Sequence, residues 1–259
     1  MSGVLKNRTL WSWAIGFMLL WLLIGAFGGS EPTSKTVEGL TVASWFAIIA
    51  LFGLSFIATN IARTISYATS SLNYGFRFTK LTPKSYITAL ICCSSVLGAI
   101  LIVVALGMTY GLFSVSYGMS MAPSNPIWAL IVSALAGVFM MAFAIMLVLV
   151  ATNYLGLRSA NLIIFLPLIV VAALSQMQIG SIVPVGAIYA SPFNSIMSLL
   201  FNSYSGTTAY AQLFNSASTA LDPGYLFASV ILWTVGLLSV DLILLRKIRP
   251  GQVEEGRQI

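Results

Sequence analysis

The chain has 259 residues, of which 59% are hydrophobic and 7% are charged, and its formal net charge is +6. Soluble domains carry about a quarter charged residues, so this composition excludes an ordinary soluble fold. It predicts a polytopic membrane protein in which basic residues flank the spans, and it argues against a nucleic-acid partner.

Six segments are apolar enough to cross a bilayer, whose core of about 30 Å takes about 20 helical residues. In chain order they are residues 10–28, 40–62, 86–112, 126–153, 161–182 and 225–245. The sequence therefore predicts an all-α polytopic membrane protein, residues 1–259 forming a single transmembrane domain. The first segment could instead be a cleaved signal peptide, but it is longer than a typical signal core and carries Trp11, Trp13 and Trp21, which suit a membrane interface.

The positions of the basic residues predict the orientation, because Lys and Arg are enriched in cytoplasmic loops. With an even number of spans and both termini in the cytoplasm, eleven basic residues lie on the cytoplasmic side and only Lys35 lies outside. The predicted location is the plasma membrane. The eleven are Lys6, Arg8, Arg63, Arg77, Lys80, Lys84, Arg158, Arg246, Lys247, Arg249 and Arg257.

Residues 67–83 form the one substantial polar segment between two spans on the predicted cytoplasmic side. Pro83 ends the preceding helix, since proline disfavours helical geometry in the residue before it. Thr82 is a possible N-cap and Pro83 a favoured first residue for the next span. The segment predicts a short helix parallel to the membrane, fixed rigidly to the third span. The simpler alternative is a basic loop that touches anionic lipid.

Residues 183–224, between the fifth and sixth spans, contain no basic residue and one acid, Asp222. Residues 188–204 and 208–221 each predict a short amphipathic helix, with a break at Ser205–Gly206. A helix-turn-helix that re-enters the outer leaflet fits this pattern, because irregular backbone at membrane depth must be buried in protein or line a cavity. Two interfacial helices on the outer surface fit it equally well.

Uncharged polar residues cluster in the predicted outer half and could line an exit, although hydrogen bonding between helices is the simpler role. The pathway candidates are Gln176, Gln178, Asn194, Ser198 and Asn202, with Ser195 beside them.

The sequence offers little for catalysis or metal binding. It has no histidine, which removes the commonest general base and zinc ligand. Cys92 and Cys93 are adjacent in an apolar run and have no metal-ligand spacing. Asp241 is the one acid inside a predicted span; we interpret it as reaching the cytoplasmic interface or pairing with an arginine such as Arg63 or Arg158. No phosphate-binding loop and no nucleophile elbow occurs, so we expect no enzyme activity, no catalytic residue and no bound metal.

The chain resembles the transmembrane permease subunits of type-2 ATP-binding-cassette (ABC-2) exporters. The residues that carry the resemblance are Arg77–Tyr86, which match a coupling helix followed by a threonine–proline turn, then residues 158–161, Leu166–Pro167, Pro184 and residues 191–194.

This resemblance implies that two permease subunits, identical or similar, pair in the membrane and that each coupling helix docks on a separate cytoplasmic ATPase. ATP and Mg²⁺ would bind that partner, and this chain would hold no cofactor. Independently of the resemblance, spans rich in Leu, Ile, Val, Phe and Met with no central charge favour a hydrophobic or amphipathic cargo, such as a lipid, drug or peptide, over a bare ion. Membrane lipid surrounds the bundle. The implied docking residues are Asn73, Tyr74, Phe76, Arg77 and Lys80.

Two other classes of function stay open. A membrane scaffold or assembly factor would have no transport cycle and would bring no ATPase with it. An ion-coupled carrier or intramembrane enzyme would need buried ionisable groups, and the lack of histidine and of paired buried acids argues against it.

Overall fold

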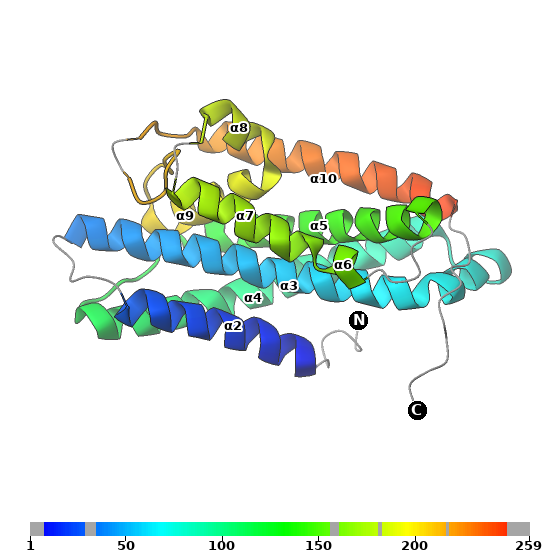
Figure 1. Ribbon diagram of the computed structural model, residues 1–259, viewed down its shortest axis with the longest axis horizontal. Coiled ribbons are helices and arrows are strands. Elements are labelled where there is room, and N and C mark those ends of the chain that lie inside the picture. The colour runs from blue at the N-terminus through cyan, green and yellow to red at the C-terminus, as the bar shows by residue number, and fades with distance from the viewer. Residues whose placement is uncertain (1–7, 29–34, 156–160, 181–182, 216–217, 248–259) are drawn as a thin grey trace.

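The structure is a computed structural model that describes residues 8–28, 35–155, 161–180, 183–215 and 218–247. These residues form an elongated bundle of roughly antiparallel helices (Figure 1), and their only strand-like feature is an isolated bridge between Tyr210 and Ala220. The all-α class is therefore confirmed. The elements are α2 (Arg8–Phe27), α3 (Lys35–Phe78), α4 (Pro83–Tyr117), α5 (Pro126–Val150), η1 (Ala151–Leu155), α6 (Asn161–Ile164), α7 (Leu166–Gly180), α8 (Val185–Ala190), α9 (Pro192–Ser205) and α10 (Pro223–Arg246).

Four helices in the described part of the chain are long and apolar enough to cross a membrane: Val37–Ala68 within α3, α4, Pro126–Tyr154 and α10. These four correspond to the second, third, fourth and sixth predicted spans. The first and fifth predicted spans correspond to shorter apolar helices, Trp11–Phe27 and Leu166–Gly180. The chain is thus a membrane-embedded helix bundle.

The fifth predicted span is interrupted near its start, between α6 and α7. Pro167 is the second residue of α7, and its backbone nitrogen carries no hydrogen, so it cannot donate a hydrogen bond to the preceding turn. The chain turns at Phe165, whose carbonyl oxygen accepts from the amides of Leu168 and Ile169, both at 3.1 Å. The break therefore follows from the proline.

The polar segment after the second span is helical, but it is not a separate helix as predicted. It is the last part of α3, which runs unbroken for 44 residues, a length of about 66 Å at 1.5 Å per residue. The whole bilayer with its headgroups is about 40–45 Å thick, so one end of α3 must project beyond it. The prediction failed because residues 63–78 contain no proline, and their one glycine, Gly75, does not interrupt α3.

The start of α4 is as predicted. Thr82 is the N-cap residue, its hydroxyl oxygen accepts from the backbone amide of Ser85 at 3.2 Å, and Pro83 occupies the first turn. Thr79 adds a second local link, since its hydroxyl donates to the Gly75 carbonyl at 2.6 Å and accepts from the Leu81 amide at 3.1 Å. Side-chain hydrogen bonds thus fix the turn between α3 and α4.

The segment between α7 and α10 agrees with the prediction only in part. The predicted helix at residues 188–204 is broken at Ser191, whose backbone is extended, so that residues 188–190 end α8 and the rest belongs to α9. Helix α9 forms and ends at Gly206, which has the left-handed φ of +72° that favours glycine.

The predicted helix at residues 208–221 is wrong, because the described residues there, 208–215 and 218–221, are irregular. Two backbone bonds join them, from the Ala211 amide to the Thr219 carbonyl and from the Leu221 amide to the Ala209 carbonyl. The Ser218 hydroxyl bonds the local backbone instead, donating to the Asn215 carbonyl at 2.8 Å, and a bond of this kind competes with a helix.

Helix α9 lies inside the protein rather than on its surface. It packs against α3, α5, α7 and α10, and twelve of its residues are buried. Its end is tied to the loop between α4 and α5, where the amides of Ser124 and Asn125 donate to the carbonyls of Tyr204 and Ser203 at 2.9 and 3.0 Å. Burial raises the pKa of the Tyr204 hydroxyl, which stays protonated and donates to the Met121 carbonyl at 2.7 Å.

Helices α4 and α5 cross in very close contact at two glycines. Each glycine belongs to a Ser-x-x-x-Gly pattern, Ser94 to Gly98 in α4 and Ser133 to Gly137 in α5. A Cβ atom on Gly137 would lie 2.5 Å from the Ser94 carbonyl oxygen, and one on Gly98 would collide with that of Ser133. Small residues at this spacing let the backbones of membrane helices approach each other.

We predict that Gly98→Val forces α4 and α5 apart and lowers the free energy of unfolding by about 1–3 kcal/mol, the usual cost of overpacking. The measurement is the thermal unfolding midpoint in mild detergent. Gly107→Val, also in α4, is the matched control because a Cβ atom there meets nothing within 4 Å. Equal midpoints for the two variants would contradict the close crossing.

Candidate functional site

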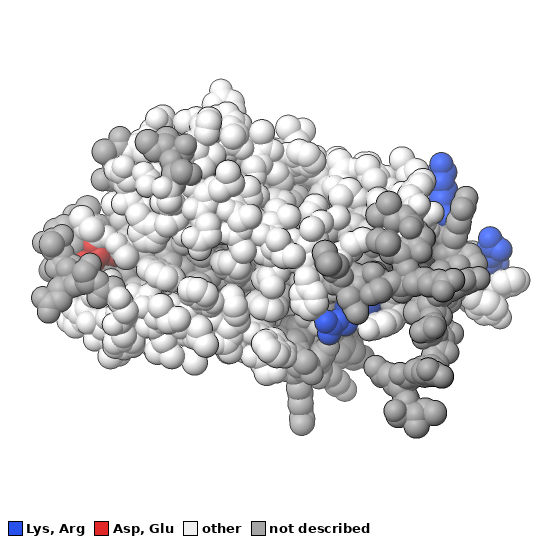
Figure 2. All heavy atoms as spheres, in the orientation of Figure 1, with Lys and Arg blue, Asp and Glu red and all other residues white. Residues whose placement is uncertain are grey.

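Five of the described basic residues gather at one end of the bundle, where Figure 2 shows blue atoms, while the visible acidic atoms lie at the other end, where Lys35 begins α3. We call the first the basic end. It comprises the end of α3, the start of α4 and the end of α10, which carry Arg77, Lys80, Lys84, Arg246 and Lys247. The charge asymmetry that the sequence predicts is therefore present in three dimensions.

The tip of the α3–α4 hairpin is the farthest-reaching part of the basic end (Figure 1). Of the five predicted docking residues, Tyr74, Arg77 and Lys80 are exposed there. The other two turn inward: Asn73 is buried, and the ring of Phe76 meets that of Tyr86 on α4 edge to face, with centroids 6.0 Å apart. Three of the five can thus contact a partner directly, and Phe76 braces the hairpin.

Sequence reasoning missed Phe78, the last residue of α3. Its side chain is 70% exposed, and its ring lies 4.8 Å from that of Tyr74, which is 64% exposed. An aromatic pair exposed beside Arg77 is a typical protein-contact element, since aromatic residues and arginine are enriched at interfaces. The spacing of four residues on a helix was the signal that could have identified it.

A groove on the side of the bundle is a second candidate site, and we call it the Arg63 groove. It has a volume of about 440 Å³, and α2, α3 and the start of α7 form its walls. Its lining residues are Trp13, Phe17, Phe56, Thr59, Asn60, Arg63, Phe165 and Leu168.

Arg63 is the one charged side chain among these lining residues, and it is exposed to the groove. Its guanidinium carbon lies 5.9 Å from the centroid of the Phe165 ring, within the range of a cation–π contact. Thr59 and Asn60 bond their own helix, at the carbonyls of Ser55 and Phe56. The groove therefore offers aromatic walls and one cation, which suits an amphipathic ligand with an acidic group.

Three of the predicted pathway residues form one buried network between α7 and α9. The Asn194 amide nitrogen donates to the Gln178 amide oxygen at 2.8 Å, and the Gln178 nitrogen donates to the Ser198 hydroxyl at 3.1 Å. Ser191 completes the network by donating to the other end of Asn194 at 2.7 Å. These groups connect helices here, and their role in a pathway stays a prediction.

The remaining polar candidates lie apart from this network. Gln176 is exposed on α7. Asn202 donates to the Thr207 carbonyl at 2.8 Å and so helps to end α9. Ser195 donates to the Ile188 carbonyl at 3.0 Å, which ties α9 to α8.

Two parts of the interpretation of Asp241 are wrong, its exposure at an interface and its pairing with Arg63, and its pairing with Arg158 stays a prediction. Its side chain is 0% exposed, so it does not reach an interface, and neither carboxylate oxygen has a hydrogen-bond partner among the described residues. Arg63 lies over Phe165 instead, and Arg158 falls outside the described residues. A carboxyl group buried without partners is costly, which sets Asp241 apart from the other acids.

Comparison with known proteins identifies no relative: no protein-family model matches the chain, and no curated protein matches it significantly. Within the described residues, no group of three or more Cys, Asp or Glu side chains could hold a metal ion. Cys92 and Cys93 are both free thiols.

We predict that Gln178 and Asn194 act as one unit in holding α7 against α9. Each single alanine substitution leaves a buried amide unpaired and lowers the free energy of unfolding by about 1–3 kcal/mol. In the double variant the losses are less than additive, with a coupling of about 0.6–1.7 kcal/mol, as for hydrogen bonds in membranes. Thermal unfolding of the four proteins measures this; strict additivity would show that the bond contributes nothing.

Proposed function

We propose that this chain is the permease subunit of an ATP-driven exporter, powered by a separate cytoplasmic ATPase that docks on the tip of the α3–α4 hairpin. The observation that carries the proposal is the length of α3. Its 44 residues exceed the thickness of a bilayer, so the helix presents a rigid, basic and aromatic tip to one compartment. The chain itself has no phosphate-binding loop, so ATP and Mg²⁺ belong to the partner.

In this proposal all six apolar segments cross the membrane, with both termini in the cytoplasm. Helix α2 has 20 residues, about 30 Å of helix, which matches the hydrocarbon core. Residues 161–180, which contain α6 and α7, are equal to α2 in number of residues, although a break at Phe165 divides them. The basic end faces the cytoplasm, in agreement with the distribution of Lys and Arg in membrane proteins.

The mechanism follows from the continuity of α3. The same helix carries Tyr74 and Arg77 at its tip and Phe56 and Arg63 in the groove. Arg63 and Arg77 are about 21 Å apart along the helix, with no break between them. A partner that moves the tip when it binds ATP therefore also moves the floor of the Arg63 groove. ATP drives this shift only because the ATPase binds it differently in the two states.

The cargo in this proposal is hydrophobic or amphipathic. The Arg63 groove supports this class, because four of its eight lining side chains are aromatic and its polar ones are limited to Arg63, Asn60 and Thr59. A second permease subunit, identical or similar, completes the exporter.

We predict that Tyr74→Ala combined with Arg77→Glu reduces the amount of ATPase that copurifies with the tagged chain by tenfold or more. The two side chains are exposed, so the bundle itself should keep its thermal midpoint. Mass spectrometry after purification in gentle detergent measures the partner. Tyr154→Ala combined with Lys247→Glu, at exposed sites outside the α3–α4 hairpin, is the matched control.

Recovery of the ATPase with the tip variant at the level of the unaltered protein would contradict docking at this site. Absence of any ATPase from the unaltered protein, repeated after cross-linking, would favour a scaffold instead.

Asp241 supports one alternative, an ion-coupled carrier, because it is a buried acid without a partner among the described residues. The exporter proposal predicts that Asp241→Asn, which keeps the shape and removes the charge, leaves the rate of ATP-dependent transport within about twofold. A proton-coupled carrier would lose transport and its dependence on the pH gradient. Transport into inside-out vesicles, with ATP or with a pH gradient, separates the two.

A further inference from the structure

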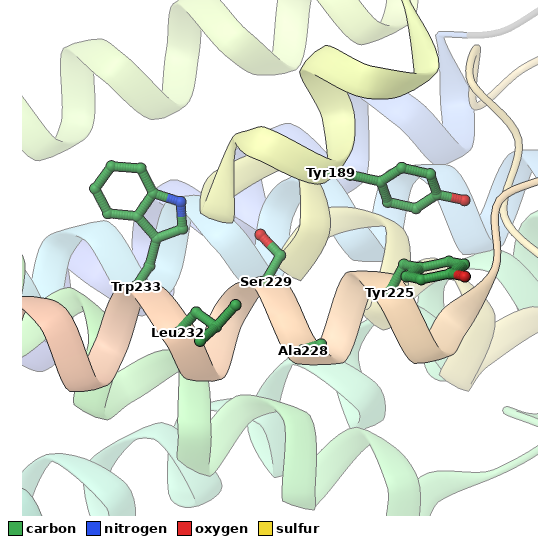
Figure 3. A pocket seen from close by; sticks show the side chains of 6 residues that line it. All are labelled: Tyr189, Tyr225, Ala228, Ser229, Leu232 and Trp233. Atoms are coloured by element: carbon green, nitrogen blue, oxygen red, sulfur yellow. The ribbon is translucent and has the colours of Figure 1, made fainter.

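A pocket of about 420 Å³ lies between α8 and α10, at the end of the bundle opposite the basic end. Figure 3 shows its six lining side chains: Tyr189 from α8, and Tyr225, Ala228, Ser229, Leu232 and Trp233 from α10. The two tyrosine rings lie together at one end and the indole of Trp233 lies at the other, with Ser229 between them. The pocket is thus a trough about two turns of helix long.

Specific ring and hydrogen-bond contacts hold the aromatic walls in place. The rings of Tyr189 and Tyr225 are 5.7 Å apart at 60°. The indole nitrogen of Trp233 donates to the Ala190 carbonyl at 2.9 Å, which fixes the ring beneath the end of α8. The hydroxyl oxygen of Tyr189 accepts from the Asp222 amide at 2.8 Å. These contacts therefore fix the positions of the three aromatic side chains that line the trough.

Ser229 has a hydroxyl that nothing in the described protein satisfies. Its oxygen is buried and has no hydrogen-bond partner among the described residues. Thr234 and Ser239 on the same helix bond back to the carbonyls of Val230 and Val235, at 2.6 and 2.8 Å. Ser229 lines the trough instead. A buried polar group of this kind points to a ligand that supplies the missing partner.

The charge around the trough favours a cation. None of the six lining side chains is charged. Asp222 is the one acid in residues 183–224, and it is exposed. Its backbone amide donates to the Tyr189 hydroxyl oxygen, and its carboxylate accepts from the Gly224 amide at 2.7 Å. That stretch of sequence contains no basic residue. Tyr and Trp faces attract quaternary ammonium groups through cation–π contacts.

We propose that this trough binds a membrane lipid with a quaternary ammonium head, which lies against Tyr189 and Tyr225 near Asp222. The rest of the lipid lies along Leu232, which is 72% exposed on a helix apolar enough to span the membrane. A lipid fits better than a soluble cation because the trough continues from its tyrosine end along the apolar face of α10. Lipid binding at this site requires a membrane but no transport, so the lipid proposal can be correct or wrong independently of the exporter proposal.

The test uses the full chain in vesicles of phosphatidylglycerol. Phosphatidylcholine with bromine near the top of its acyl chains is added in increasing amounts, and bromine quenches tryptophan fluorescence on contact. The fluorescence of Trp233 is obtained by subtracting the fluorescence of the Trp233→Phe variant from that of the unaltered protein. We expect half-maximal quenching at about fivefold less brominated phosphatidylcholine than brominated phosphatidylglycerol, equivalent to about 1 kcal/mol of cation–π attraction.

Two variants report on the contacts. Tyr225→Leu removes an exposed aromatic face and should reduce the preference to less than about twofold. Asp222→Asn should also weaken it, and it keeps the N-cap of α10 because asparagine caps helices as well as aspartate does. Tyr154→Leu, an exposed tyrosine outside the trough, is the matched control and should keep the full preference.

Three results would overturn the proposal. The first is equal quenching by both brominated lipids. The second is a preference that survives both Tyr225→Leu and Asp222→Asn. The third is a change of Trp233 emission with choline chloride, at matched ionic strength, in vesicles that show no preference for phosphatidylcholine, since the ligand would then be a soluble cation.

Discussion

The close crossing of α4 and α5 is the constraint on which the rest of the bundle depends. The carbonyl of Ser94 and the α-carbon of Gly137 approach so closely that no side chain fits between them. Hydrocarbon tails are as apolar as leucine, so membrane helices gain little by burying apolar area and rely on close packing and hydrogen bonds. Helix α5 then contacts α3, α9 and α10 on its other sides. Its position, set by two glycines, therefore locates both the long helix α3 and the buried helix α9.

Helix α3 joins the two ends of the molecule. It meets the irregular loop near one end, where the Ser44 hydroxyl donates to the Leu213 carbonyl at 3.2 Å, and it forms the exposed tip at the other. Between them it supplies one wall of the Arg63 groove. The polar links at the two ends differ in kind: buried amides and hydroxyls join α7 to α9, whereas exposed charges and aromatic rings mark the tip. Buried hydrogen bonds thus hold the helices together at one end of the bundle, whereas the other end exposes groups that are suited to contact with another protein.

The sequence was sufficient for the helical class, the start of α4 at Thr82–Pro83 and the break at Gly206, because strong local signals determine each of them. It failed where tertiary packing decides. No local signal shows that α3 continues to Phe78, that residues 208–215 and 218–221 form no helix, or that Asn73 turns inward while Tyr74 turns outward. The Arg63 groove was also missed, because Trp13, Phe56 and Phe165 lie far apart in the chain and only the bundle brings them together.

The burial of α9 has a consequence for how the protein assembles. With 14 residues the helix is about 21 Å long, too short to cross a bilayer alone, and its Asn and Ser side chains would be costly in contact with lipid. It can enter its site only after α3, α5 and α7 have formed the surrounding walls, and its arrival satisfies the amide of Gln178. We therefore expect the docking of α9 to be a late folding step, and a chain stalled before it to leave the buried amide of Gln178 unpaired.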